Sequence, residues 1–363
     1  VVTTTRSGNL PDGTACESLD LARLDTIAPL VERVAPDVVV NATAYTAVDR
    51  AEDDVDTAFL INRDAPARLA EVCAARGSRL VHFSTDYVFD GAGTRPWRED
   101  DAPAPLGVYG QSKLAGEQAI QASAAHHLIL RTAWVYGLHG ANFLLTMLRL
   151  ASEREELSVV ADQVGSPTPA WLIADVTATI LRQGMAASGV CHLVSAGQTS
   201  WHGFAEAIFD EAHDLGLLAR KPRVTPIPTS GFPTRATRPA YSVLDTGRLE
   251  REFGIELPAW RQALRTTLSD VVLIGEDGHL IGLHRVAIAA YALIDMSRHV
   301  HEVTGSRRQR TRQTIRGGFR ALRIWTVFHQ VDVEVGGLRV VSVASQNGLN
   351  QLHGLTDAGL RSA

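Results

Sequence analysis

Residues 79–113 read RLVHFSTDYVFDGAGTRPWREDDAPAPLGVYGQSK, which predicts a buried strand, a polar strand end, a long loop and the start of a helix. The run at 80–83 has the length of a strand and stops at Ser84. In open α/β sheets, ligands bind beyond the carboxyl ends of the strands. We therefore expect the Thr85 hydroxyl and the Asp86 carboxylate to face a ligand.

Tyr109 and Lys113 lie one helical turn apart at the start of the predicted helix, so their side chains share a face. A phenol has a reference pKa of about 10 and is a poor acid at neutral pH unless a nearby cation favours its phenolate. A carbonyl that receives hydride develops negative charge on oxygen, which Tyr109 would protonate while Thr85 holds it by a hydrogen bond. The alternative interpretation of the spacing is an ordinary exposed pair on a helix.

The use of basic residues favours a specific role for Lys113. Only Lys113 and Lys221 are lysines among the 35 basic residues, so arginine stands almost everywhere that a general cation would serve. A compact ammonium fits below a phenol and a ribose and has a pKa that its surroundings can tune. A planar guanidinium offers neither property.

Length and composition predict a globular protein. A chain of 363 residues with 45% hydrophobic residues forms two domains, or one large domain with an appendage. The net charge of -5 argues against nucleic acid as a partner, and no apolar run has the length of a membrane span. The three cysteines are widely spaced without a metal-ligand pattern, so we expect reduced thiols and no metal site. No secretory signal is visible, and we expect a cytoplasmic protein.

Strand and helix patterns alternate along the first half of the chain. A strand end at 19–21, a helical stripe at 22–33, a strand-like run at 37–41, a helical stripe at 62–76 and the run at 79–85 follow one another, and residues 128–133 supply another strand. Near-continuous apolar strands that alternate with helices are typical of a parallel sheet covered on both faces. The sequence therefore predicts an α/β protein with a Rossmann-like, doubly wound parallel sheet and a smaller substrate-binding domain.

Five motifs occur in an order that resembles one enzyme family. They are FSTDYVFDG at 83–91, VYGQSKLAGE at 108–117, LRTAWVYG at 130–137, DQVGSPT at 162–168 and RPAYSVLDTGRL at 238–249. Together they resemble the dTDP-4-dehydrorhamnose reductases, which are extended short-chain dehydrogenases/reductases, over roughly residues 15–270. Sugar-nucleotide epimerases and dehydratases of the same superfamily share the Tyr-x-x-x-Lys spacing.

The resemblance implies reduction of dTDP-4-dehydro-L-rhamnose to dTDP-L-rhamnose with NADPH or NADH. It implies that Tyr109 donates the proton, that Lys113 lowers the pKa of Tyr109 and holds the cofactor ribose, and that Thr85 orients the carbonyl. The other implied contacts are Asp20 and Leu21 with adenine, Ala44, Tyr45 and Thr46 along the cofactor, and Trp134 with the substrate sugar. Without the family, these residues read as ordinary strand-to-helix loops and a buried aromatic.

The amino terminus departs from the family pattern. Such reductases open with a strand, a glycine-rich turn and a helix, and none of the three precedes Val1. We therefore expect an N-terminally truncated dinucleotide-binding domain and weakened cofactor binding. Gly275, Gly278 and Gly282 follow an apolar run and precede a helical stripe, so a permuted glycine-rich turn is a second hypothesis.

Three regions follow from these patterns. Residues 1–135 form the dinucleotide-binding domain, and residues 136–270 form mainly the substrate domain with returning elements of the large sheet. Residues 271–363 are a C-terminal extension of uncertain order. Their arginine cluster at 307–323 reads as a solvated tail or, alternatively, as a phosphate-binding patch.

The function predicted from the sequence is that of an NAD(P)H-dependent oxidoreductase in dTDP-rhamnose biosynthesis. Its partner is a dTDP-sugar substrate, without nucleic acid or membrane, and a homodimer stays open. Two alternatives also remain: another epimerase or reductase of the superfamily, and a non-catalytic, nucleotide-sugar-binding regulatory subunit.

Overall fold

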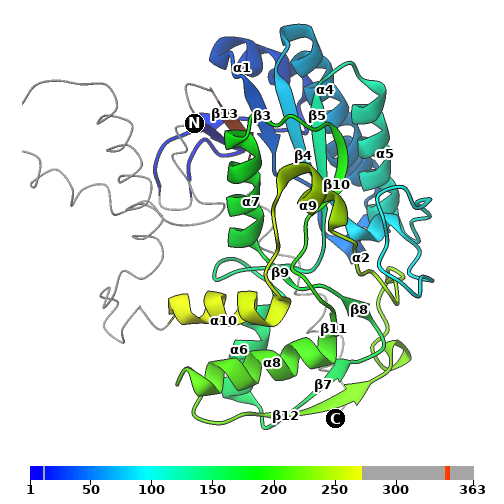
Figure 1. Cartoon of the computed structure of the whole chain (residues 1–363), viewed down its shortest axis with the longest axis vertical. Coiled ribbons are helices and arrows are strands. Elements are labelled where there is room, and N and C mark those ends of the chain that lie inside the picture. Colours follow the sequence, from blue (N-terminus) through cyan, green and yellow to red (C-terminus); the bar gives the residue numbers. More distant parts are fainter. Residues whose placement is uncertain (11–12, 272–339, 344–363) are drawn as a thin grey trace, which may run out of the picture.

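The computed structural model describes residues 1–10, 13–271 and 340–343 and has a large α/β lobe above a smaller one (Figure 1). The large lobe contains a seven-stranded sheet in which every neighbouring pair of strands is parallel. In spatial order the strands are β10 (Gly189–His192), β5 (His127–Thr132), β4 (Arg79–Thr85), β3 (Val38–Asn41), β13 (Val340–Val343), β1 (Val2–Thr5) and β2 (Glu17–Ser18). The predicted Rossmann-like fold class is confirmed.

Helices cover both faces of this sheet (Figure 1). One face carries α1 (Ile27–Val34), α4 (Ala65–Arg76) and α5 (Val108–Ala122), and the other carries α7 (Ala170–Arg182) and α9 (Gly247–Phe253). The central strands between them contribute apolar residues to the cores on both faces, and β3 is buried along its whole length. This double burial explains why the strands appear in the sequence as continuous apolar runs and not as alternating ones.

The ends of α4 show how local sequence sets the helices. Asn62 and its neighbours precede α4 in a π-helical segment, η2 (Leu60–Asp64), and α4 stops at Gly77. Gly77 adopts φ 74°, and its N–H bonds to the carbonyl of Ala74 while the Ser78 N–H bonds to that of Cys73. A glycine in this left-handed conformation satisfies the last helix carbonyls and turns the chain into β4.

A C-terminal strand lies in the middle of the sheet. β13 pairs with β1 through Val2↔Val341 to Thr4↔Val343 and with β3 through Val340↔Val38 to Val343↔Asn41. The amino-terminal truncation predicted from the sequence would leave a gap in the sheet. Among the described residues, the four residues of β13 lie between β1 and β3 at this position.

The order of the strands reverses at β13. On one side β1 and β2 follow each other outward, and on the other β3, β4, β5 and β10 do the same. In doubly wound sheets the ligand crevice lies beyond the carboxyl ends of the strands at such a reversal. By this rule we expect a ligand to bind at the ends of β13 and β3, beside the end of β4.

The smaller lobe is built on helices and two-stranded sheets. Its core lies between α6 (Phe143–Glu153), α8 (Trp201–Asp214) and α10 (Trp260–Val271). The strand pairs are β7 (Glu156–Val160) with β12 (Arg223–Ile227), β8 (Val164–Gly165) with β11 (Thr199–Ser200), and β6 (Val135–Tyr136) with β9 (Thr168–Pro169). The remaining short helical segments of the described chain, in both lobes, are η1 (Leu24–Thr26), α2 (Val48–Ala51), α3 (Val55–Phe59), η3 (Asp86–Val88) and η4 (Thr229–Gly231).

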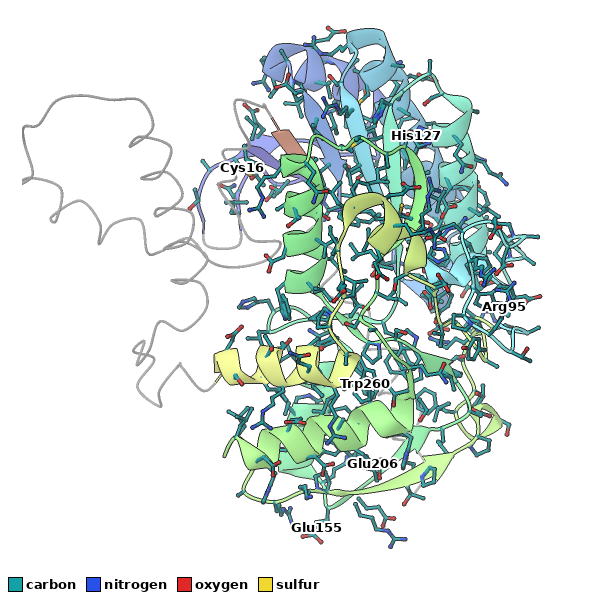
Figure 2. The ribbon with its side chains drawn as sticks, in the orientation of Figure 1. Cys16, Arg95, His127, Glu155, Glu206 and Trp260 are labelled. Carbon is teal, nitrogen blue, oxygen red and sulfur yellow. The ribbon has the colours of Figure 1, made fainter. Side chains whose placement is uncertain are left out.

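The strands of the large sheet run toward the small lobe (Figure 2). His127 marks the amino end of β5, far from the small lobe, whereas Trp260 at the start of α10 lies within it. The carboxyl ends of the strands therefore point toward the small lobe. Across the part of the chain that the structure describes, no helix has the length and apolarity to cross a bilayer.

Two predictions lie outside the described residues. They are the permuted turn at Gly275, Gly278 and Gly282 and the arginine cluster at 307–323.

Candidate active site

Thr85 and Tyr109 come together at the carboxyl end of β4. Thr85 is the last residue of β4 and is 5% exposed, and its hydroxyl donates to Asp86 Oδ1 at 3.1 Å and accepts from the Tyr87 N–H at 3.2 Å. The phenol of Tyr109, in the first turn of α5, lies near enough to the Thr85 side chain for that hydroxyl to lower its pKa. Two hydroxyl groups from distant parts of the sequence thus form the pair that the sequence predicts.

A carboxylate from elsewhere in the chain anchors the start of α5. Gly107 at the helix N-cap offers no side chain, and Glu52 Oε1 accepts from the Val108 N–H at 2.9 Å. A negative charge at a helix N-terminus satisfies a free donor and interacts favourably with the helix dipole. Glu52 therefore fixes the turn that carries Tyr109.

The phenol of Tyr109 is held in its protonated form. Burial raises the pKa of Tyr109 to about 12, and the nearby hydroxyl of Thr85 acts in the opposite direction. The sequence predicts that Lys113 lowers this pKa. Burial outweighs any such effect here, and Nζ of Lys113 bonds to the Phe83 carbonyl at 2.6 Å and contacts His82 at 3.2 Å instead of the phenol.

Lys113 is almost completely buried beside β4, at 2% exposure. Burial lowers the pKa of Lys113 to about 8, and the charge of Glu117 partly offsets that effect. An ammonium group has three N–H donors, of which the Phe83 carbonyl takes one, and the direction of the contact with His82 depends on the ring tautomer. At least one donor is therefore left for a ligand hydroxyl.

Two buried contacts beneath Lys113 were not foreseen from the sequence. His82 in β4 bonds to Lys113 on one side and to Asn41 of β3 on the other, where Nδ1 and Nδ2 lie 3.0 Å apart. Glu117 forms a buried ion pair with Arg131 of β5, with contacts of 2.7 and 3.0 Å. Polar residues inside an apolar strand run, such as His82 in RLVHF, were the signal available.

Asp86 lies next to Thr85 and is 2% exposed. Burial raises the pKa of Asp86 to about 6, and the nearby hydroxyls of Ser242 and Thr85 act in the opposite direction. Ser242 belongs to the loop that follows Pro239. Asp86 therefore lies near a loop that is distant in the chain.

Asn62 connects the expected cofactor loop to α5. Its Oδ1 accepts from the Tyr45 N–H at 2.8 Å, and its Nδ2 donates to the Tyr45 carbonyl at 2.9 Å and to Ser112 Oγ at 3.0 Å. Ala44, Tyr45 and Thr46 are half-buried just after β3, at the same sheet edge as Thr85. The loop and the helix with Tyr109 are thus held by one buried amide.

Asp20 and Leu21 follow β2 at the outer end of the same edge. Asp20 Oδ1 accepts from the Ala22 N–H at 3.0 Å, which forms a local turn, and Leu21 is buried in the core against α1. Their adenine contacts stay a prediction.

Trp134 has a strained backbone after β5. Its φ of 47° lies in the left-handed region, which bulky side chains rarely adopt and which is frequent at ligand sites. Its ring stacks on that of Trp201 with centroids 3.6 Å apart, and a Cβ on Gly165 would lie 2.5 Å from it. The geometry holds the indole at the edge that carries Thr85, where a sugar contact is predicted.

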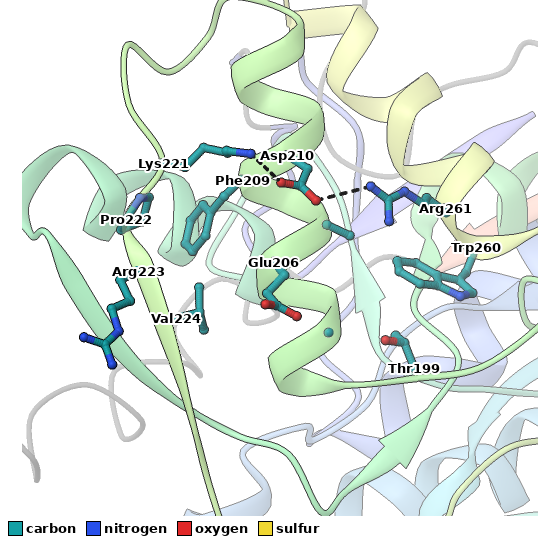
Figure 3. A pocket seen from close by; sticks show the side chains of 12 residues that line it. Thr199, Glu206, Phe209, Asp210, Lys221, Pro222, Arg223, Val224, Trp260 and Arg261 are labelled. Atoms are coloured by element: carbon teal, nitrogen blue, oxygen red, sulfur yellow. Dashed lines mark hydrogen bonds and ion pairs between the residues drawn. The ribbon is translucent and has the colours of Figure 1, made fainter.

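A separate cavity of about 550 Å³ lies in the small lobe. Figure 3 shows Lys221, Asp210 and Arg261 in a row along its rim, linked at 3.0 and 3.4 Å. None of the residues predicted for the active site lines this cavity. The candidate site therefore stays at the edge of the large sheet.

The residues at this edge suit a nicotinamide dinucleotide. Besides the free donor of Lys113, the buried hydroxyls of Ser84 and Thr132 have no hydrogen-bond partner among residues 1–10, 13–271 and 340–343. Buried polar atoms without a partner are rare and need an explanation such as a ligand. Tyr109, Lys113 and the 44–46 loop are the groups that would hold the cofactor.

Comparisons with known proteins agree with this geometry. The family model described as RmlD substrate binding domain matches residues 2–273. The dTDP-4-dehydrorhamnose reductase of Burkholderia thailandensis is 49% identical over 267 residues, which are 71% of this chain and 90% of that protein. That of Salmonella typhimurium is 44% identical over 255 residues, or 69% and 85%. The structure of the Bacillus anthracis dTDP-4-dehydrorhamnose reductase in complex with NADP has a TM-score of 0.66 and 33% identity, covering 74% of this chain and 98% of that one.

Proposed function

The chain belongs to the RmlD substrate binding domain family, and on that premise we propose that it reduces dTDP-4-dehydro-L-rhamnose to dTDP-L-rhamnose with NADPH or NADH. The observation that carries the proposal is the Thr85–Tyr109 hydroxyl pair with Lys113 buried one helical turn away. This set supports the reduction of a carbonyl, because it combines a proton donor, a hydrogen-bond donor and a cation.

The chemistry divides between cofactor and chain. The nicotinamide cofactor supplies a hydride for the C4 carbonyl carbon of the sugar, and the carbonyl oxygen takes up a proton. Tyr109 gives this proton: a phenol with a pKa of about 12 stays protonated at neutral pH, yet is more acidic than the alcohol that forms. Thr85 orients the oxygen by a hydrogen bond. Asp86 and Trp134 contact the sugar on either side and place its carbonyl next to Tyr109.

The chain's cofactor contacts follow from the same placement. Lys113 offers its remaining N–H to a ribose hydroxyl, while Ala44, Tyr45 and Thr46 line the path along the sheet edge toward Asp20 and Leu21. In this proposal residues 1–135 hold the dinucleotide and residues 136–270 hold mainly the dTDP-sugar. A cytoplasmic location and a homodimer complete the proposal, and light scattering of the purified chain tests the dimer.

A coupled assay tests the activity. The full chain, NADPH and enzymatically prepared dTDP-4-dehydro-L-rhamnose should give loss of NADPH absorbance and an equal amount of dTDP-L-rhamnose by chromatography. An epimerised dTDP sugar without net NADPH loss would point instead to an epimerase. Binding of the dTDP sugar without any turnover would point to the regulatory subunit.

A further inference from the structure

Asn41 fixes the direction of a buried row of hydrogen bonds. Its Oδ1 accepts from the Thr43 N–H at 3.1 Å and from the Thr43 hydroxyl at 2.5 Å. A backbone N–H can only donate, so the oxygen of the Asn41 amide must face Thr43. Nδ2, the donor end of the amide, then faces Nδ1 of His82 at 3.0 Å.

This contact determines which ring nitrogen of His82 carries the proton. Because Asn41 Nδ2 donates, Nδ1 of His82 must accept, and a neutral ring then carries its hydrogen on Nε2. The ring is neutral, since an accepting Nδ1 carries no proton and burial lowers the pKa of His82 well below its usual value. The Nε2–H points at Lys113, whose Nζ lies 3.2 Å away.

The two forms of Lys113 respond differently to this N–H. An ammonium has three donors and no acceptor, whereas a neutral amine has a lone pair that accepts a hydrogen bond. The bond from Nζ to the Phe83 carbonyl, at 2.6 Å, is available to both forms. The contact with His82 therefore favours the amine alone.

We infer that His82 is a positioning residue that controls the charge of Lys113: its Nε2–H stabilises the amine, and the ammonium forms only when this hydrogen bond is lost. The consequence for catalysis rests on the proposed function, in which the ammonium holds the cofactor. His82 would then set the pH above which the reductase fails.

Other charged groups around Lys113 leave this role to His82. On α5 itself, Glu117 favours the ammonium, but Arg131 of β5 already pairs with its carboxylate at 2.7 Å. From η3, Asp86 acts on Tyr109. The segment η2 packs against α5, and its two charged residues, Arg63 and Asp64, pair with each other at 2.6 Å.

The ring tautomer can be measured in the unmodified protein. In NMR spectra of the full chain with isotope-labelled histidine, the signals that disappear in His82→Asn identify this ring. We expect a neutral ring with the proton on Nε2 and an unprotonated Nδ1 across the neutral pH range. A proton on Nδ1, or a ring that is positively charged at neutral pH, would overturn the inference without reference to any variant's stability.

The charge of Lys113 is also directly observable, because the chain contains two lysines. Labelled lysine gives two signals, and the half-exposed Lys221, paired with Asp210 at 3.0 Å, is an internal control. His82→Asn keeps an acceptor for Asn41 and deletes the Nε2–H. We expect the titration midpoint of Lys113 to rise by about 0.5 pH unit or more, the scale of one modest hydrogen bond, while Lys221 stays unchanged. An unchanged or lower midpoint contradicts the inference.

A second variant reverses the tautomer. In Asn41→Asp, a carboxylate would accept from Nδ1–H, so that Nε2 presents a lone pair to the ammonium, and the midpoint should rise by more than about one pH unit. In the double variant with His82→Asn, this additional rise should largely disappear. If it persists in full, the new carboxylate acts on Lys113 through space and His82 does not transmit the effect.

Kinetics connect the measurement to the reaction. The alkaline limb of the pH profile of kcat should move with the Lys113 midpoint in each variant. If the chain shows no reductase activity but the NMR results are as expected, the proposed function fails and the role of His82 stands. If turnover is present but the titration midpoint of Lys113 is the same with and without His82, only the inference about His82 fails.

Discussion

Buried polar side chains at the end of β4 share one property: their surroundings disfavour charge. Burial raises the pKa of Asp86 to about 6 and that of Tyr109 to about 12, and it lowers the pKa of Lys113 to about 8. All three directions follow from desolvation, which penalises whichever form is ionised. Tyr109 therefore keeps its proton at neutral pH and releases it only to a strong base, such as the oxyanion formed during carbonyl reduction.

Tyr109→Phe tests the proton donor. We expect turnover to fall by about 100-fold or more, the usual scale for a lost general acid, because Thr85 alone cannot supply the proton. The free energy of unfolding and the affinity for the dTDP sugar should change little. Tyr136→Phe removes a buried phenol hydroxyl in the other lobe and is the matched control in steady-state assays. Turnover unaffected by Tyr109→Phe would exclude this residue from the mechanism.

Lys113→Arg tests whether any cation suffices. A guanidinium is wider than an ammonium, and Lys113 is enclosed by the Phe83 carbonyl and His82. We expect at least about a 100-fold loss of kcat/KM, as for other small misplacements of reacting groups. Lys221→Arg, the same change at an exposed site, should keep full activity. Normal rates in the Lys113 variant would mean that charge alone matters.

Asp86 makes a pH-dependent contribution to stability. Its pKa is raised from 3.8 to about 6 in the folded chain, so the fold binds a proton that the unfolded chain releases between these values. Stability from this residue is thus present below about pH 4 and lost as pH rises through about 6. We expect the free energy of unfolding of Asp86→Asn, measured relative to that of the unmodified chain, to be about 2 to 3 kcal/mol higher at pH 7 than at pH 4. Denaturant unfolding at both pH values measures this, and a difference that does not vary with pH would contradict it.

Among the elements, α5 and η2 form the contact on which the site depends. A Cβ on Gly116 would lie 2.0 Å from the carbonyl oxygen of Asn62, so two backbones meet where only glycine fits. The π-helical turn that presents this carbonyl also directs the Asn62 side chain to Tyr45 and Ser112. Irregular turns of this kind are frequent at functional sites. The cofactor loop and Tyr109 therefore share one support.

Gly116→Ala should push α5 and η2 apart. We expect a loss of about 1 to 3 kcal/mol in the free energy of unfolding from overpacking, together with weaker cofactor binding because Tyr45 loses its position. Gly137→Ala is the control, since its Cβ would make an ordinary contact at 3.8 Å with Ala170 and should change stability by less than about 0.5 kcal/mol. Calorimetry and NADPH titration measure both effects. Equal results for the two variants would show that α5 tolerates the displacement.

For the whole molecule, β13 joins two parts of the sheet. Among the described strand pairings, β1 and β2 reach β3 only through Val340–Val343. The position is central, at the reversal of strand order, so its loss would leave two rows of buried backbone groups unpaired. Residues 340–343 are therefore part of the sheet of the large lobe.

Ser342→Pro tests this connection, because proline removes an N–H from a strand with neighbours on both sides. We expect faster hydrogen exchange in Val2–Thr5 and Val38–Asn41 but not in Gly189–His192, and NADPH binding weaker by about tenfold, or 1.4 kcal/mol. Ser342→Thr keeps the N–H and should behave as the unmodified chain. Protection that persists in β1 and β3 would mean that the sheet does not need β13.

The sequence by itself determined the local features of this protein. Helical periodicity alone places Tyr109 and Lys113 on one face, and runs such as DVVVN identify buried parallel strands, because these signals depend on neighbours within a few residues. The motif order was sufficient for the family, and the strand ends at Thr85 and Trp134 follow from the length of the strands.

Only the tertiary structure decided which distant residues meet. His82 lies in an apolar run that does not say whether it faces Asn41, and the Glu117–Arg131 pair joins a helix to a strand across the core. The four-residue strand at 340–343 is too short to be identified by its pattern, and its place between β1 and β3 arises because two buried strand edges need a partner. Long-range pairing of this kind is set by burial and by the demand of backbone groups for hydrogen bonds, neither of which a local pattern contains.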